Sequence, residues 1–216
     1  MTRTRRRILK RYAYFLAGLL VLAFGVAFSI KAYLGTSPVS APPYVVSEFT
    51  PITVGCATII MHLLFIAGQW ALLGKKYKYF QLMQLPTAFA FGYMTDFAMW
   101  TVRGLEPSNY LWQWVFCLVG ILLVGIGVAM EVIANVVVLA GEGIILALCE
   151  VTGARFHLMK VIVDTALVAI AAVLSLVFLH KLIGVREGTL AAAWLVGPVA
   201  RKVMKIIGYT SRRILT

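Results

Sequence analysis

The phrase "GVAFSIKA", residues Gly25–Ala32, returns in nearly the same form as "GVAMEVIA", residues Gly127–Ala134. The two copies lie 102 positions apart in a chain of 216 residues. Each copy sets a polar or charged residue among apolar neighbours. A phrase repeated in this way predicts a chain built from two related halves.

The composition indicates a membrane protein. Apolar residues make up 62% of the chain and charged residues 13%, and the mean hydropathy is +0.92. A soluble domain carries roughly 45–50% apolar and about 25% charged residues. The apolar runs leave no room for a separate soluble domain. We therefore expect an all-α bundle of helices in lipid.

Six segments are long and apolar enough to form membrane-spanning helices, which need about 20 residues each. The first is about twice as long as the apolar region of a signal peptide, so we expect it to remain as a helix. The last is interrupted by Gly197 and Pro198. The predicted spans are Tyr12–Leu34, Ile52–Leu73, Phe80–Thr101, Trp112–Leu139, Val161–Leu179 and Thr189–Ile207.

Lysine and arginine predict the orientation of these helices, because cytoplasmic loops and termini carry an excess of both. The start, "MTRTRRRILKR", and the end, "RKVMKIIGYTSRR", are strongly basic, as is "GKKYKY" between the second and third spans. Both termini are therefore expected in the cytoplasm, which requires an even number of crossings. The basic residues of "HKLIGVRE" fall on the predicted outside and fit this topology less well.

The net charge of +12 has two explanations. Basic clusters occur in nucleic-acid-binding proteins, but here they flank apolar segments, where they fix topology and contact anionic lipid. We therefore expect membrane lipids as partners and no nucleic acid. Cys56, Cys117 and Cys149 stand singly, without CxxC spacing or a nearby histidine, so neither a metal nor another cofactor is expected.

The repeat extends beyond the opening phrase. One ungapped offset of 102 pairs Gly18 with Gly120, Gly25–Ala27 with Gly127–Ala129, Ala32 with Ala134, Glu48 with Glu150 and Thr50 with Thr152. A shift to 105 aligns Gly92 with Gly197 and Asp96 with Arg201. Chance similarity between glycine-rich apolar helices is the alternative to a duplication. We expect two repeats, residues 1–105 and 106–216, with three spans each.

An odd number of crossings in each repeat means that the second copy enters the membrane from the opposite side. Such inverted repeats are common in secondary transporters, where the substrate site lies between the repeats and is built from broken helices. The connections at residues 35–51 and 136–153 are interrupted by Gly, Pro or Glu and are predicted to be broken or re-entrant. An ordinary extracellular loop is the alternative for residues 35–51.

If the two connections enter from opposite faces, their tips converge inside the bundle and provide a substrate site. Thr36, Ser37 and Ser40 offer hydroxyls and free N–H groups at the start of a half-helix, which suits an anionic group. Asn135 and Glu142 are the candidates in the second half. We expect these five residues to bind a small polar or anionic solute.

Ionisable residues in apolar runs are candidates for proton coupling or gating, because a charge at the bilayer centre costs at least about 2.5–3.5 kcal/mol. His62 and Asp164 occupy equivalent positions in the two repeats. Asp96 and Arg201 each follow a glycine by four residues and are expected to pair, either as a gate or as a structural salt bridge. The full set is His62, Asp96, Glu131, Glu150, Asp164 and Arg201.

Three segments resemble the YczE/YyaS/YitT family of bacterial integral membrane proteins. They are "FGVAFSIKAYLGTSP" and "LPTAFAFGYMTDF" in the first repeat and "GVREGTLAAAWLVGPVARK" in the second. The resemblance covers residues 16–202, and relatives often carry a tryptophan where Val39 stands here. It implies a multi-pass protein of the bacterial inner (cytoplasmic) membrane and a transport function, but no particular substrate.

Two functions fit these observations. The first is a secondary transporter that moves the solute by alternating access, with protons as a candidate coupling ion. The second is a non-transporting scaffold or accessory subunit, whose acidic residues would lie in salt bridges or at the rims instead of around a central cavity. An enzyme is not expected, because no HExxH or GxSxG motif occurs. Ala166, Ala169 and Ala172 permit close packing within one chain or in a homo-oligomer.

Overall fold

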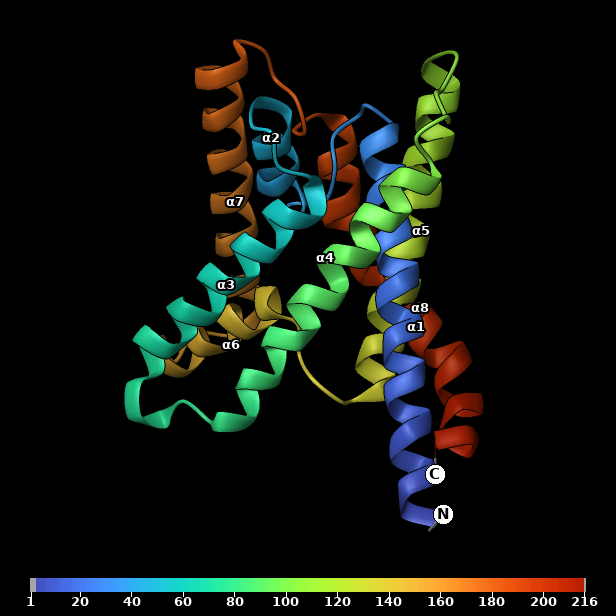
Figure 1. Ribbon diagram of the computed structural model, residues 1–216, viewed down its shortest axis with the longest axis vertical. Coiled ribbons are helices and arrows are strands. Elements are labelled where there is room, and N and C mark those ends of the chain that lie inside the picture. The colour runs from blue at the N-terminus through green and yellow to red at the C-terminus, as the bar shows by residue number, and fades with distance from the viewer. Residues whose placement is uncertain (1–2, 216) are drawn as a thin grey trace.

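The chain folds into a bundle of helices in the computed structural model, which describes the backbone of residues 3–215 and the side chains of residues 7–207. Eight α-helices account for most of this range (Figure 1). They are α1 (Arg3–Lys31), α2 (Ala41–Phe49), α3 (Val54–Leu73), α4 (Gln84–Thr101), α5 (Tyr110–Ala134), α6 (Ala140–Thr152), α7 (Phe156–Leu179) and α8 (Glu187–Leu215). Two short 3₁₀ helices, Gly74–Lys76 and Tyr79–Met83, join α3 to α4.

Four helical segments within the described residues are long and apolar enough to cross a membrane: Arg7–Lys31, Val54–Lys76, Tyr110–Ala134 and Phe156–Leu179. The prediction of a multi-pass, all-α membrane protein is therefore confirmed. The other two predicted spans form α4 and α8. Helix α4 has 18 residues, but polar residues such as Gln84, Thr95 and Asp96 lower its hydropathy. In α8, charged residues at positions 201, 202 and 205 shorten the uncharged part. Neither helix meets the same criterion of length and composition.

The predicted span Trp112–Leu139 was wrong at its end, because helix α5 ends at Ala134. Asn135 has left-handed backbone angles (φ 47°, ψ 52°), which asparagine tolerates better than most residues. The apolar run continues through residues 136–139, but these residues are not helical, and α6 begins at Ala140. Hydrophobicity alone did not reveal this break.

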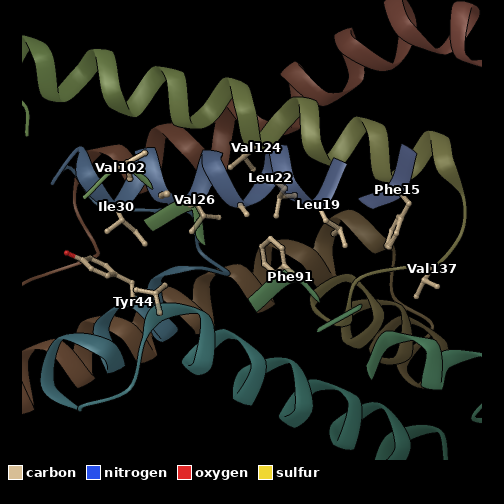
Figure 2. Packing of buried hydrophobic residues seen from close by; sticks show 14 of the residues in the cluster. Phe15, Leu19, Leu22, Val26, Ile30, Tyr44, Phe91, Val102, Val124 and Val137 are labelled. Carbon is tan, nitrogen blue, oxygen red and sulfur yellow. The ribbon is translucent and has the colours of Figure 1, made fainter. Parts of the chain in front are cut away.

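Helices α1 and α5, which we call the two central helices because they make the most extensive helix contact, lie side by side along most of their lengths (Figure 1). Apolar side chains on α1 recur every three or four residues, as expected for a buried helix face. Figure 2 shows this row, with Phe91 of α4 and Val137 after α5 facing it. The buried residues of the row are Phe15, Leu19, Leu22, Val26 and Ile30.

Glycines allow α1 and α5 to approach closely in antiparallel directions. A Cβ atom added at Gly25 would lie 2.5 Å from the backbone nitrogen of Val124. One added at Gly127 would lie 2.8 Å from the backbone nitrogen of Leu22. Small residues at such crossings let helix backbones pack closely in lipid. The repeated glycines therefore mark the contact between the two central helices.

Helices α4 and α8 pack directly on this pair, whereas α2, α3, α6 and α7 pack mainly on one another and join the pair through α4. Helix α4 packs on α1 and on α3, while α8 packs on α5. The short helix α2 packs between α3 and α7, and α6 packs between the same two helices. Phe49 of α2 stacks on Phe178 of α7, with ring centroids 4.5 Å apart.

Candidate functional site

A hollow of about 290 Å³ lies between the start of α4, the end of α5 and the start of α6. Glu131, Asn135 and Glu142, which the sequence predicted to be functional, all line it. The buried Gln84 also lines it, on the opposite wall. The other lining residues are Phe80, Gln81, Val132, Val136, Val137, Val138, Gly143 and Leu146. Side chains from distant parts of the sequence thus form one hollow, in which a few polar groups stand among apolar ones.

The end of helix α5 is held by charged side chains from two directions. The buried carboxylate of Glu131 accepts a hydrogen bond from the backbone N–H of Leu139 at 3.1 Å. Arg11 of α1 donates to the carbonyls of Ala134 at 2.9 Å and Asn135 at 2.8 Å. The last carbonyls of a helix have no partner within the helix and carry partial negative charge, so a guanidinium stabilises them. Glu131 and Arg11 therefore fix the backbone on one side of the hollow.

Arg11 was missed in the sequence, because the basic start of the chain was interpreted only as a topology signal. Its position just before a long apolar run gives no indication of a partner more than a hundred residues away.

A buried pair of glutamines forms the other missed part of the site. The amide of Gln69 donates to Oε1 of Gln84 at 2.9 Å, and Gln84 donates back to Gln69 at 3.1 Å. Gln69 also donates to the carbonyl of Ala140 at 3.3 Å. These bonds join α3, α4 and the first residue of α6. The signals in the sequence were Gln69, the one glutamine in the run 52–73, and Gln84, the second of two glutamines at the start of the run 80–101.

Glu142 lies in the first turn of α6, between Gly141 and Gly143. Lys160 and Asp164 of α7 are close enough to influence its carboxylate electrostatically. These two residues form an ion pair with each other, with 3.0 Å between Nζ of Lys160 and Oδ2 of Asp164. Asp164 is therefore partnered by a lysine one helical turn away, near the hollow but not on its lining.

Thr36, Ser37 and Ser40 do not line the hollow, so the structure does not assemble the five predicted substrate residues in one place. The hydroxyl of Ser37 donates to that of Ser40 at 3.0 Å. Thr36 is buried, and its side-chain oxygen has no hydrogen-bond partner among the described residues.

The tips of the two connections nevertheless meet. Cγ1 of Val39, which lies between Ser37 and Ser40, is 3.4 Å from the position that a Cβ atom would take at Gly141. Gly141 directly precedes Glu142. The first connection therefore reaches the start of α6, although its hydroxyl-bearing residues do not enter the hollow.

The structure does not bring together the two residue pairs predicted to couple or gate. His62 is buried and stacks on Phe91 of α4 with a centroid distance of 5.7 Å, whereas Asp164 is paired with Lys160. Asp96 accepts hydrogen bonds from the hydroxyl of Thr53 at 2.6 Å and the N–H of Gly55 at 2.7 Å. It thereby binds the start of α3, where helix N–H groups lack partners.

Arg201 and Glu150 complete the predicted set, and both are exposed. No ion pair joins Arg201 to Asp96 within the range whose side chains are described. Over the same range, no group of three or more His, Cys, Asp or Glu side chains is arranged to hold a metal ion.

Comparison with known proteins places these features in a family. A family model described as "Family of unknown function (DUF6198)" matches residues 9–205. YyaS of Bacillus subtilis (strain 168), an uncharacterized protein, is 30% identical over 121 residues, which is 56% of this chain and 59% of YyaS. This chain thus spans about three fifths of the length of YyaS.

YczE of the same strain, an uncharacterized membrane protein, is 28% identical over 150 residues, which is 69% of this chain and 67% of YczE. The resemblance to YczE and YyaS is therefore confirmed. No solved structure matches the chain.

Proposed function

Because this chain belongs to the DUF6198 family, whose function is unknown, we propose its function from its own residues. It is a secondary transporter that carries a small polar solute across the membrane by alternating access of two inverted repeats. The observation that carries this proposal is the two-fold symmetry of the contact between α1 and α5.

This symmetry follows the sequence offset of 102 residues. Gly25 of α1 lies against Val124 of α5. The residues equivalent to these two, Gly127 of α5 and Leu22 of α1, lie against each other in the same way. Because α1 and α5 are antiparallel, an axis that exchanges them is perpendicular to both helices. For helices that cross a membrane, such an axis lies in the membrane plane, as it does in transporters with inverted repeats.

Local backbone features support the same relationship. Tyr33 and Asn135, 102 residues apart, have positive φ angles of 56° and 47°. Tyr33 lies two residues after the end of α1 and Asn135 one residue after the end of α5. The hydroxyls of Thr50 and Thr152 each donate to the carbonyl four residues earlier at 2.7 Å. Both features are what a duplicated segment would show, and they support the proposed repeat.

The proposed repeat also indicates whether the two less apolar helices, α4 and α8, cross the membrane. Helix α4 packs on α1 as its counterpart α8 packs on α5. We infer that both cross the membrane, which gives six spans with both termini in the cytoplasm. Helices α2 and α6 are then half-helices of two re-entrant connections, whose tips meet at the equivalent residues Val39 and Gly141.

The hollow favours a neutral or positively charged solute over an anionic one. Two of its polar lining groups, Glu131 and Glu142, are acidic, and the amides of Asn135 and Gln84 can donate or accept. Glu142 lies in the first turn of α6, where its carboxylate occupies the position that an anion would take at a helix start. Proton coupling through Glu131 or Glu142 is compatible with this arrangement.

A scaffold function is the alternative, and the exposure of α7 favours it. Only 17% of its most apolar window is buried inside the chain, compared with 56% for the window in α1. A partner protein or a second copy of the chain would find an apolar surface there, as would lipid.

A thermal-shift screen of the detergent-purified protein tests the transporter proposal. The probes are amines, amino acids, sugars, nucleobases, organic acids and inorganic ions. A ligand that binds only the folded state stabilises it by about 2.7 kcal/mol at one hundred times its dissociation constant. We expect a stabilising ligand whose effect is lost in Glu142→Gln and kept in Glu150→Gln, an exposed position on the same helix.

Uptake of that ligand into proteoliposomes completes the test. A ligand that binds equally well to Glu131→Gln and Glu142→Gln would contradict the site. Binding without any uptake would favour the scaffold.

A further inference from the structure

The two ends of the molecule differ, although their sequences are related. One end, where α1 begins and α8 ends, contains the hollow, because Arg11 of α1 binds Asn135 on the cavity wall. We call it the terminal end and the opposite one the far end (Figure 1).

At the far end, residues 184–189 are bonded directly to residues 33–36, and we call this contact the seal. The N–H of Gly188 donates to the carbonyl of Leu34 at 2.7 Å, and the N–H of Thr36 donates to that of Gly184 at 3.1 Å. The guanidinium of Arg186 donates to the carbonyl of Tyr33 at 3.0 Å. These three hydrogen bonds join the two segments of the seal directly.

The counterparts of these segments form the two walls of the hollow. The offset of 102 relates residues 33–36 to residues 135–138, and the shift to 105 relates residues 184–189 to residues 79–84. Phe80, Gln81 and Gln84 line one wall, and residues 135–138 line the other. The same pair of segments is thus joined at the far end and separated at the terminal end.

We propose that these two segment pairs are alternating gates. Residues 79–84 close onto residues 135–138 when residues 184–189 separate from residues 33–36. This inference rests on the proposed function and adds the moving parts to it. The structure is then the state with the far gate closed and the terminal gate open.

The guanidinium contacts indicate what holds this state. The carbonyl of Tyr33 is bound by Arg186, across the seal. The equivalent carbonyl of Asn135 is bound by Arg11 of α1 instead of by a residue of the 79–84 segment. Gln81, the counterpart of Arg186, bonds through its side chain to the N–H of Lys78 within its own segment. Arg11 therefore occupies the acceptor that a closed terminal gate would use.

Disulfide cross-linking of the full-length protein tests the gates without any solute. Cys56, Cys117 and Cys149 are first replaced by alanine. The pair Leu34→Cys and Gly188→Cys reports the far gate. A Cβ atom at Gly188 would lie 3.0 Å from that of Leu34, so a small shift would bring the two to the roughly 3.5–4.5 Å found in disulfides. The equivalent pair Val136→Cys and Met83→Cys reports the terminal gate.

We expect the far pair to cross-link readily and the terminal pair slowly. Arg186→Ala, which weakens the seal, should raise the cross-linking rate of the terminal pair several-fold, whereas Lys181→Ala, an exposed change nearby, should not. Complete cross-linking of both pairs in the same molecule would overturn the proposal. So would a terminal pair whose rate does not respond to Arg186→Ala.

Cysteine labelling provides a second test if Gly188→Cys does not fold. Thr36→Cys lies in the seal and is buried, and its counterpart Val138→Cys lies on the hollow and is exposed. Arg186→Ala should increase maleimide labelling of the first and decrease that of the second, and parallel changes would contradict alternating gates. Opposite changes in labelling without solute uptake would support the gates and reject the transporter. Solute uptake without opposite changes in labelling would support the transporter and reject the gates.

Discussion

Arg11 binds the carbonyl of Asn135, a residue 124 positions later, through a 2.8 Å hydrogen bond from Nη2. This bond connects the basic start of the chain to the wall of the hollow. It gives the first prediction, because the proposed gates place Arg11 in the open state of the terminal gate.

Arg11→Gln should lower thermal stability and make the hollow less accessible. A hydrogen bond to a charged group contributes about 1.5–3 kcal/mol, and partial exposure of Arg11 places the effect at the lower end of that range. The melting temperature in detergent and maleimide labelling of Val138→Cys measure the two effects. Arg7→Gln, an exposed change one turn earlier, is the matched control. Equal effects of both variants would reject a specific role for Arg11.

The glycines of the central contact are the second prediction. Gly25→Ala and Gly127→Ala should each destabilise the protein by about 1–3 kcal/mol, because the added methyl group meets the backbone of the opposite helix. Gly197→Ala is the control, since a Cβ atom there meets nothing within 4 Å. Thermal denaturation of the three purified variants checks the order. A two-fold symmetric contact also requires the first two losses to be similar, and a large difference between them would contradict it.

The buried glutamines are the third prediction. Gln69→Leu should destabilise the protein, because it leaves the polar groups of Gln84 without their partner in a buried position. Gln84→Leu should do the same, and the double variant should be less destabilised than the sum of the two. Hydrogen bonds between membrane helices couple by about 0.6 kcal/mol on average and by up to about 1.7. A double-mutant cycle with additive losses would show that the pair contributes nothing.

The sequence predicted the central helices well because their physical signals are local. Apolar runs longer than 20 residues identify α1 and α5, and the glycines that set their contact are repeated at one offset. Glu131, Asn135 and Glu142 were identified for the same kind of reason. They interrupt apolar surroundings near a helix end, and the structure places all three on one hollow.

Other parts of the site depend on contacts that no local pattern encodes. Gln69 and Gln84 lie on different helices, so their pairing depends on how α3 and α4 pack. The predicted role of Ser37 and Ser40 assumed that hydroxyls near a helix start face the cavity, yet these two hydroxyls bond to each other. The sequence showed which positions carry polar side chains, but it did not show the directions in which those side chains point.

Asp96 gives the last prediction, because the sequence and the structure assign it different partners. Pairing with Arg201 would make the two residues energetically coupled, whereas the structure bonds Asp96 to Thr53 and Gly55 at the start of α3. Asp96→Ala should therefore cost about 0.5–2 kcal/mol, the range for loss of a helix cap. Arg201→Gln should change stability little, because Arg201 is exposed.

A double-mutant cycle measured by thermal denaturation separates these cases. We expect Asp96→Ala to be coupled to Thr53→Val and additive with Arg201→Gln. Coupling to Arg201 instead would restore the charge pair and would require α4 and α8 to approach each other in another state of the transport cycle.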